Sequence, residues 1–502
     1  MAAFPGRKSA ARWTPGRALT PAAYARWTVK TCFLLWAIFL LPLPAFARSK
    51  PQIVVTNVTV IDMTGSPPRS GMTVAIGGGR ILKLSTHHPA TIPKGTEIVD
   101  GTGKFLIPSL WDMHVHVLDS DKMLPLFVAN GVLGVRDLGV HDLESILRWR
   151  AEAAAGKIIS PRIVTAGKVL DGVPQADPSF SIPVTSPEEG RRAVRDLKSK
   201  AVDCIKVYDV LSRDSYFAIA EEATKAGLPF VGHVPTAITT VEASDAGQKS
   251  IEHLGKILED SSGSPGTIRA AQTESIKEGD YFAFTTRIGR TYDAVISSYD
   301  NQKARALFAF FRKNGTWQVP TLSIKNSRTF IDELDAQGDP RAKYVAESER
   351  NYWKPQVGFF SRYRTPSYIA AQKAYFRKEL DVVGAMQHSG VRIMAGTDTP
   401  NPYVIAGFSL HDELALLVTA GLTPMEALQT ATRSPAEFFG ELKRSGTIEK
   451  GKSANLILLD ANPLDDIKNT RRISAVVQNG RYLSRTNLDN MLAEVEAAAG
   501  RK

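Results

Sequence analysis

Cysteine is almost absent from this chain of 502 residues. There are two, Cys32 and Cys204, and Cys32 lies in an N-terminal apolar run. A fold held together by disulfides is therefore excluded. Acidic residues are absent from positions 1–47, which carry six basic ones. No apolar run after position 47 approaches the roughly 20 residues that span a bilayer, so no later segment is expected to cross a membrane.

The acid-free N-terminus has the layout of a secretory signal. Basic residues precede the apolar run T-C-F-L-L-W-A-I-F-L-L-P-L-P, and a small-x-small cleavage pattern ends at Ala47. We expect residues 1–47 to be a signal peptide, with export to the periplasm or the extracellular space and no stable membrane span after cleavage. A start codon downstream of Met1 and retention of the segment as an anchor are the alternatives.

Cleavage there removes six basic residues and no acidic one, so the formal charge falls from +11 to +5. The basic character of the whole chain thus comes largely from the signal segment. No Lys/Arg-rich run remains. Nucleic acid is therefore not expected as a partner.

Both ends of the expected mature chain consist of short alternating runs typical of strands. Glycines at 77–79 and the pair Asn479 and Gly480 indicate hairpin turns. Neither end is long enough to bury two sheet faces. We expect residues 48–105 and 441–485 to form one small β-sandwich, with a C-terminal helix at 486–502.

Between these ends, strand-like runs alternate with helical ones, as in βα units around a parallel sheet. Eight such apolar runs occur in residues 106–440: L-I-P-S-L-W-D-M-H, V-L-G-V-R-D, R-I-V-T-A-G, D-C-I-K-V-Y, L-P-F-V-G-H, K-S-I-E-H, W-Q-V-P-T and V-R-I-M-A-G-T-D. Eight strands predict an α/β fold, namely a (β/α)8 TIM barrel.

Several of these runs end in residues that can bind a cation: His114, His116, Lys206, His233, His253 and Asp398. The carboxyl ends of all barrel strands face one mouth, so these residues should meet there. Singly, each has an ordinary explanation: a histidine can pack in a core, and Asp398 can end a turn. A buried lysine in an apolar run is harder to explain, because an unpaired ammonium is costly to bury.

The ordered motifs I-P-S-L-W-D-M-H-V-H, I-K-V-Y, V-G-H-V, S-I-E-H-L and A-G-T-D-T resemble those of the amidohydrolase superfamily. Within it, the chain is most similar to the imidazolonepropionase-like and Xaa-Pro dipeptidase-like branch of metal-dependent hydrolases. The C-terminal G-T-I-E-K-G-K-S-A-N-L-I-L-L-D and the segment after Asp398 extend the resemblance over nearly all the mature chain. Ser109 departs from the pattern, because the family has glycine there.

The resemblance implies two divalent metal ions. His114, His116 and Asp398 would hold the more buried ion, and His233 and His253 the more exposed one. Lys206 would bridge them as a carbamate formed with CO₂. Zn²⁺ is the expected metal, with Mn²⁺, Co²⁺ or Fe²⁺ as alternatives. Asp398 would also be the catalytic base of a hydrolysis by metal-activated hydroxide.

Other polar residues near the expected mouth are weaker candidates. His141 follows the second strand, and Tyr208 lies on the same side of its strand as Lys206, so both are candidate substrate contacts. Arg136 and Asp137 could pair with each other. For His411 a structural role is favoured over a metal role. Aromatic residues between 352 and 363 could form a lid or simply pack.

The resemblance favours an exported enzyme that cleaves C–N bonds in dipeptides or N-acyl amino acids, with dipeptidase-like or carboxypeptidase-like activity. Its partner would be a small molecule or short peptide, and a homo-oligomer is not excluded. Cyclic amides, carbamates, aryl-ureas, lactones and phosphotriesters are alternative substrates. A non-catalytic metal-binding receptor is the alternative of another class, although it would need neither the base Asp398 nor the bridging Lys206.

Overall fold

The structure of the chain is a computed structural model. It describes residues 52–86, 92–118, 123–175, 178–277, 289, 291–334, 339–362 and 364–500. All of them belong to one compact unit, Lys50–Lys502. The expected signal peptide at 1–47 lies outside the described residues. Among the described helices, none combines the length and the apolar character needed to cross a membrane.

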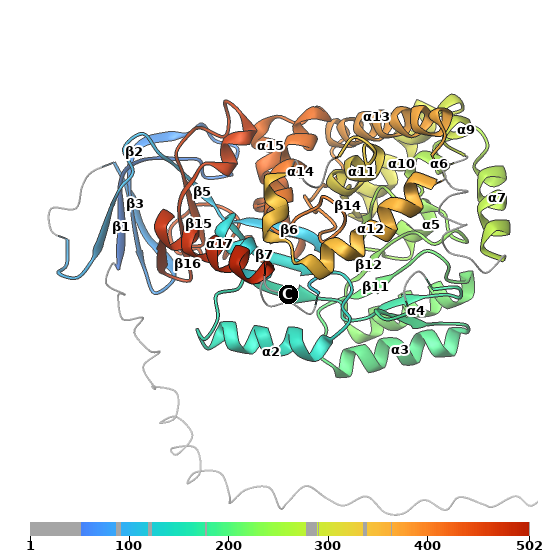
Figure 1. Cartoon of the computed structure of the whole chain (residues 1–502), viewed down its shortest axis with the longest axis horizontal. Helices are drawn as coiled ribbons and strands as arrows, with labels where there is room; N and C mark the ends of the chain where they lie inside the picture. The colour runs from blue at the N-terminus through green and yellow to red at the C-terminus, as the bar shows by residue number, and fades with distance from the viewer. Residues whose placement is uncertain are drawn as a thin grey trace, which may run out of the picture. The chain divides into compact units, whose positions relative to one another are not determined.

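Strands from both ends of the chain form one hydrogen-bonded sheet. Its members are β1 (Ile53–Val60), β2 (Arg69–Gly77), β3 (Arg80–Ser85), β4 (Glu97–Asp100), β5 (Phe105–Pro108), β15 (Leu456–Leu459), β16 (Ile473–Gln478) and β17 (Arg481–Ser484). The order is β17-β16-β15-β5-β1-β2-β3, and β4 pairs with β1. Figure 1 shows the N-terminal strands beside the C-terminal β15 and β16. The expected β-rich domain built from both ends is therefore confirmed.

Local sequence explains the hairpins of this sheet. The β2–β3 turn contains Gly78 and Gly79, at φ 58° and 69°, and the β16–β17 turn contains Asn479 and Gly480, at φ 51° and 82°. Two successive residues with positive φ give a turn whose twist matches that of the strands, and Gly and Asn adopt it at least cost. The predicted turns are confirmed.

The far edge of the sheet bonds to the chain just before β15. The amide of Ile81 donates to the carbonyl of Lys452 (2.9 Å), and the amide of Ala454 donates to the carbonyl of Gly79 (2.9 Å). Strand β3 thus pairs with the segment that leads into β15, and the sheet closes on itself. Its interior holds Val, Ile, Leu, Met and Ala side chains from both ends of the chain.

The middle of the chain forms the parallel strands of the barrel. One sheet contains β6 (Leu110–Val115), β7 (Val132–Asp137) and β8 (Arg162–Thr165). The other has the order β10-β9-β11-β12-β13-β14, made of β9 (Val169–Asp171), β10 (Ser181–Pro183), β11 (Ile205–Val207), β12 (Phe230–Gly232), β13 (Ser250–Glu252) and β14 (Trp317–Val319).

The eighth run, at 391–398, closes the barrel between β14 and β6. The amide of Met394 donates to the carbonyl of Gln318 (2.9 Å), and the amide of Met113 donates to the carbonyl of Ala395 (2.9 Å). Between β8 and β11, the amide of Asp203 donates to the carbonyl of Thr165 (2.8 Å). The predicted (β/α)8 barrel is confirmed.

Helices surround these strands (Figure 1). They are α1 (Met123–Ala129), α2 (Leu143–Ala154), α3 (Pro187–Ser199), α4 (Arg213–Ala226), α5 (Thr240–Asp245), α6 (Ile257–Asp260), α7 (Pro265–Lys277), α9 (Tyr292–Ser297), α10 (Asn301–Asn314), α11 (Leu322–Thr329), η1 (Pro340–Tyr344), α12 (Glu347–Arg362), α13 (Pro366–His388), α14 (Phe408–Thr419), α15 (Pro424–Thr430), α16 (Arg433–Phe438), η2 (Ile467–Arg471) and α17 (Arg485–Ala499).

The first expected barrel run is divided at Ser109. Residues Phe105–Pro108 form β5, which pairs antiparallel with β15 in the β-rich sheet, and the barrel strand begins at Leu110. The amide of Ser109 donates to the carbonyl of Asn455 (2.9 Å). One continuous apolar run therefore passes from one sheet to the other, a change of direction that its periodicity does not reveal.

Candidate active site

The six expected metal-site residues lie at the carboxyl ends of barrel strands. His114 is in β6 and His116 follows it, Lys206 is in β11, and the others follow β12, β13 and the run at 391–395. His114, Lys206 and Asp398 are buried, and the other three imidazoles are half-buried. All six come from segments that meet at one mouth, as the barrel topology predicts.

Short distances join these side chains. Oδ1 of Asp398 lies 3.2 Å from Nε2 of His116 and 3.5 Å from Nε2 of His114. Nζ of Lys206 lies 3.5 Å from Nε2 of His114. The ring centroid of His253 is 4.5 Å from that of His114 and 4.7 Å from that of His233. His114, His116 and Asp398 form a group whose ligand atoms all lie within 4.8 Å of one another.

Each of the four imidazoles has its Nδ1 atom beside an oxygen that can accept a hydrogen bond. Two of the oxygens belong to carboxylates: Nδ1 of His114 is 2.9 Å from Oε2 of Glu252, and Nδ1 of His233 is 2.9 Å from Oδ1 of Asp209. Nδ1 of His116 is 2.9 Å from the carbonyl oxygen of Gly139. Nδ1 of His253 is 2.6 Å from Oγ1 of Thr321. The Thr321 hydroxyl itself donates to the carbonyl of Pro320 (2.8 Å), so its oxygen accepts from the imidazole.

These partners assign the same tautomer to all four rings. A carboxylate or a carbonyl only accepts, so each Nδ1 carries the proton and each Nε2 carries a lone pair. Nε2 of His233 is buried and has no hydrogen-bond partner among the described residues. Nε2 of His114 and of His116 face an oxygen of Asp398, which also offers a lone pair. Lone pairs that converge in this way need a cation between them, so the residues fit a divalent metal site.

Burial and local charge set the protonation of these groups. Burial lowers the pKa of Lys206 to about 8. Burial also lowers the pKa of His233, and that of His253 well below its ordinary value. Burial alone would raise the pKa of Asp398, but the neighbouring His114 and the hydrogen bond with His116 hold it below its ordinary value. Burial alone would lower the pKa of His116 too, but its contact with Asp398 raises it. The site therefore favours neutral imidazoles at His114, His233 and His253, an ionised carboxylate and an easily deprotonated lysine.

A buried ion pair supports His114 from behind. Glu252 and Arg136 are fully buried, and NH2 of Arg136 donates to Oε1 of Glu252 at 2.9 Å. The same guanidinium donates to the carbonyl of Met113 (2.7 Å) and to Oγ of Ser250 (2.9 Å). Arg136 thus orients the carboxylate that orients His114. Glu252 was not among the predicted site residues, although an acidic residue inside a buried apolar strand is a signal of the same kind as Lys206.

Three residues at the site have left-handed backbones that are unfavourable for non-glycine residues. His253 has φ 60°, Thr321 has φ 49° and Asp398 has φ 65°. Such conformations cost of order 1–3 kcal/mol each and persist where the surroundings enforce them. The amide of Asp398 donates to the carbonyl of His114 (2.7 Å), and this bond ties the strained residue to the first strand.

The two candidate substrate contacts lie on one aromatic wall. The ring of Tyr208 stacks on that of His233, with centroids 4.1 Å apart and 27° between the planes. Phe180 lies between the candidates, 5.8 Å from His141 and 6.5 Å from Tyr208 by ring centroids. Oγ of Ser179 lies 2.8 Å from Nδ1 of His141. Phe180 follows β9 in a loop that no sequence motif marked.

The pairing of Arg136 with Asp137 was wrong, because the two side chains point to different partners. Oδ2 of Asp137 accepts from the Thr165 hydroxyl (2.7 Å), whereas Arg136 bonds to Glu252. His411 is buried, with Nδ1 2.9 Å from Oγ1 of Thr470, so its contacts are structural.

Of the aromatic residues expected in a lid or a packed segment at 352–363, only the side chain of Trp353 is among those that the structure describes. In the excursion at 352–363, Trp353 is buried and its ring centroid lies 5.9 Å from that of Tyr403. The other aromatic side chains of that segment are not described.

Comparisons with known proteins agree with this geometry. Residues 326–483 match the amidohydrolase family. The chain is 36% identical over 73 residues to an adenine deaminase of Rhizobium meliloti, a match that covers 14% of this chain and 12% of the deaminase.

Solved structures match over most of the chain. A bottromycin amidohydrolase has a TM-score of 0.67 at 24% identity, covering 90% of this chain and 91% of that one. A Xaa-Pro dipeptidase has a TM-score of 0.62 at 20% identity, covering 86% of this chain and 99% of that one. The chain thus contains an amidohydrolase family domain and shares its fold with amidohydrolase-superfamily members that include Xaa-Pro dipeptidase-like proteins.

Proposed function

We propose that this protein is an exported, metal-dependent amidohydrolase that cleaves C–N bonds in dipeptides or N-acyl amino acids. The observation that carries the proposal is the common orientation of the four imidazoles. Every Nδ1 is engaged by an oxygen, so every Nε2 is left with a lone pair for a ligand, and those of His114 and His116 lie 3.5 and 3.2 Å from Oδ1 of Asp398. Export rests on residues 1–47, and N-terminal sequencing of the secreted protein would test it.

The ligands divide into two sets. His114, His116 and Asp398 would hold one divalent ion, and His233 and His253 the other, with Lys206 between them. When bound, such a pair lowers the pKa of a water molecule and polarises the carbonyl of a substrate. Zn²⁺ suits this mixture of nitrogen and oxygen donors, and Mn²⁺, Co²⁺ and Fe²⁺ are alternatives.

Lys206 is suited to become a carbamate. Its buried ammonium has a lowered pKa, of about 8, so a substantial fraction of the amine is neutral near physiological pH. The neutral amine is the form whose nitrogen adds to CO₂, and loss of a proton from that nitrogen leaves an anionic carbamate. Two carbamate oxygens would then serve both ligand sets.

Asp398 is suited to act as the base. Its carboxylate is ionised and lies beside the Nε2 atoms of His114 and His116, and its backbone is held in place by the His114 carbonyl. It would accept a proton from the attacking water and deliver it to the leaving nitrogen. His141 and Tyr208 would contact the substrate from the aromatic wall that includes Phe180.

The substrate class rests on the likeness to a Xaa-Pro dipeptidase and on the polar groups of that wall. The test is a panel of dipeptides and N-acyl amino acids, assayed with protein reconstituted separately with Zn²⁺, Mn²⁺ and Co²⁺. Metal-dependent release of a free amino acid is the expected result. The panel also contains cyclic amides, carbamates, aryl-ureas, lactones and phosphotriesters, and hydrolysis of these alone would replace the proposed substrate class.

One variant and the result of the wild-type panel together distinguish an enzyme from a metal-binding receptor. Asp398→Asn should retain most of the metal and lose nearly all turnover, because the amide can ligate but cannot accept the proton. Stoichiometric metal in the wild type with no hydrolysis of any compound in the panel would instead favour a metal-binding receptor.

A further inference from the structure

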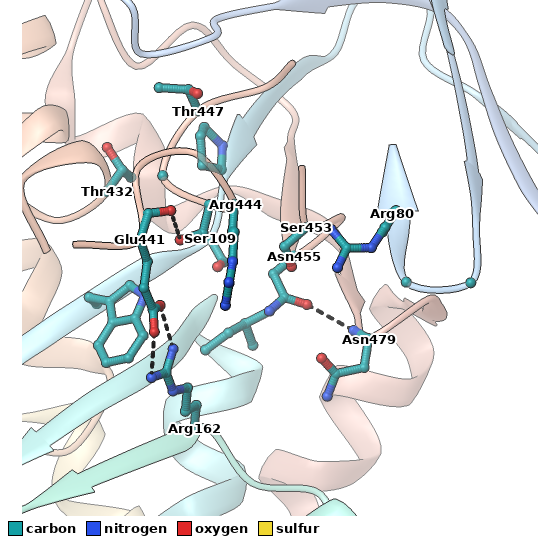
Figure 2. Close-up of a pocket in the computed structure, with 17 residues that line it drawn as sticks. Arg80, Ser109, Arg162, Thr432, Glu441, Arg444, Thr447, Ser453, Asn455 and Asn479 are labelled. Atoms are coloured by element: carbon teal, nitrogen blue, oxygen red, sulfur yellow. Dashed lines mark hydrogen bonds and ion pairs between the residues drawn. The ribbon is translucent and has the colours of Figure 1, made fainter. Parts of the chain in front are cut away.

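A cavity of about 480 Å³ lies at the end of the barrel opposite the metal-site residues. Trp111, near the start of β6, and Arg162, at the start of β8, form its barrel side. The β2–β3 turn and the segment before β15 form the other side. Figure 2 shows the polar side chains that point into it. The cavity therefore lies where the β-rich sheet meets the amino-terminal ends of the barrel strands. The histidines lie at the opposite, carboxyl-terminal ends of those strands.

Two of the charged side chains in the cavity wall, Arg162 and Glu441, form an ion pair and cancel each other's charge. NH1 and NH2 of Arg162 donate to the two carboxylate oxygens of Glu441, at 2.6 and 2.9 Å. The guanidinium carbon of Arg162 also lies 5.5 Å from the Trp111 ring centroid, within the range of a cation–π contact. This pair is held in place and adds no net charge to the cavity.

Two further guanidinium groups remain without a carboxylate partner among the described residues. Arg80 donates from NH1 to the carbonyl of Gly451 (2.9 Å), which positions it and leaves its other N–H groups available. Arg444 has no ion pair in the described part of the chain. Both line the cavity, and both residues are exposed. The lining thus has a surplus of two positive charges.

Asn455 adds a further donor to the lining. Oδ1 of Asn455 accepts from the backbone amide of Asn479 (2.8 Å), so the NH₂ group of Asn455 remains free to donate (Figure 2). The two hairpin turns approach closely here: a Cβ added to Gly79 would lie 3.6 Å from the backbone of Asn479. Arg80 lies at the start of β3 and Asn455 lies in the segment before β15. The pairing of these two segments therefore holds both donors in place.

We propose that this cavity binds a small dianionic molecule through Arg80 and Arg444, at a site separate from the metal centre. Guanidinium groups recognise carboxylate and phosphate oxygens through paired N–H donors. A volume of this size, at a junction between two parts of a fold, suits a small metabolite. The shared chemistry of the ligand is two negative charges on a compact body, found in phosphate monoesters and in dicarboxylates.

The test is isothermal titration of the metal-loaded full chain with inorganic phosphate and, separately, with succinate, at low ionic strength. Arg80→Ala and Arg444→Ala should each weaken binding at least tenfold. Lys83→Ala and Lys443→Ala are the matched controls, because both remove an exposed cation close in sequence without touching the cavity lining, and they should leave the affinity within twofold. All four side chains are exposed, so each variant should melt at the wild-type temperature without ligand.

The outcomes are distinct. Binding of phosphate alone, or of succinate alone, with loss in both arginine variants supports the site and identifies its ligand class. Binding that is equal in the wild type and the arginine variants would assign the anion to the metal centre and overturn the proposal. Absence of binding by either probe to the wild type would overturn it as well. None of these results depends on whether the protein hydrolyses an amide.

Discussion

The substitution Glu252→Gln tests whether the buried ion pair sets the tautomer of His114. The carboxylate accepts from Arg136 and from the Ser250 hydroxyl (2.6 Å) through Oε1, and from Nδ1 of His114 through Oε2. Glutamine has one acceptor oxygen and one donor nitrogen at these positions. If its oxygen faces Arg136, its NH₂ group meets the Nδ1 proton of His114, and if it is flipped, the NH₂ group meets the guanidinium.

Both orientations carry a cost that can be estimated. Breaking a fully buried ion pair by removing one charge costs about 3–5 kcal/mol, because the other charge stays buried without a counter-ion. Loss of the hydrogen bond behind a metal-ligating histidine costs about 10–100-fold in metal affinity. We therefore expect Glu252→Gln to lower the free energy of unfolding of the metal-free protein by about 3–5 kcal/mol and to weaken metal binding at least tenfold.

Urea denaturation of the metal-free protein measures the first quantity, and titration with Zn²⁺ against a competing chelator measures the second. Glu441→Gln is the matched control, because it breaks a half-exposed pair with Arg162 and should cost less than about 1 kcal/mol. A Glu252→Gln variant with wild-type stability and wild-type metal affinity would refute the role of the pair.

The double variant Arg136→Met/Glu252→Gln refines this test. Without the guanidinium, the glutamine oxygen can turn toward His114 and its NH₂ group toward the Ser250 oxygen. The double variant should therefore bind metal more tightly than Glu252→Gln alone, with a coupling energy of about 0.5–3 kcal/mol between the two positions. Additive losses would show that Glu252 and Arg136 act independently.

Asp398→Asn should keep most of its metal, by elemental analysis, while turnover of any substrate found falls to background. At a constant concentration of dissolved CO₂, metal reconstitution should accelerate as the pH rises from about 7 to about 9, because the pKa of Lys206 is about 8 and only its neutral amine reacts with CO₂. A rate at constant dissolved CO₂ that is flat or falling over this range would contradict carbamate formation. Gly396→Ala would place a Cβ 2.8 Å from the backbone nitrogen of His114, so it should lower the free energy of unfolding by about 1–3 kcal/mol and reduce the metal content. Gly266→Ala is the control, because its Cβ would have no atom within 4 Å, and it should change neither quantity. Urea denaturation and elemental analysis measure the two effects.

Sequence periodicity predicted the barrel and the residues at its mouth because both depend on local spacing. His114 and His116 are two residues apart at a strand end, and Lys206 interrupts an apolar strand, so each carries its signal within a few residues. Strand ends in a closed parallel barrel all face one side, and this general rule was enough to bring Asp398 near the histidines before any distance was known.

The orientation of the ligands was not predictable in this way. Glu252 lies 138 residues from the His114 it orients, and Thr321 lies 68 residues from His253. Such contacts depend on the register between strands and on the geometry of the loops that follow the strands. The local sequence around a residue does not fix either of these.

Residue alternation and the backbone preferences of glycine and asparagine were therefore enough to predict the barrel strands, the two hairpin turns and the types of residue at the barrel mouth. The change of sheet at Ser109, the closure of the β-rich sheet and the common tautomer of the four histidines became visible only in the folded chain. Folding alone brought Arg80 and Arg444 to one cavity. Each of these results needs hydrogen bonds or close packing between segments far apart in the chain, which form only when the whole core is assembled.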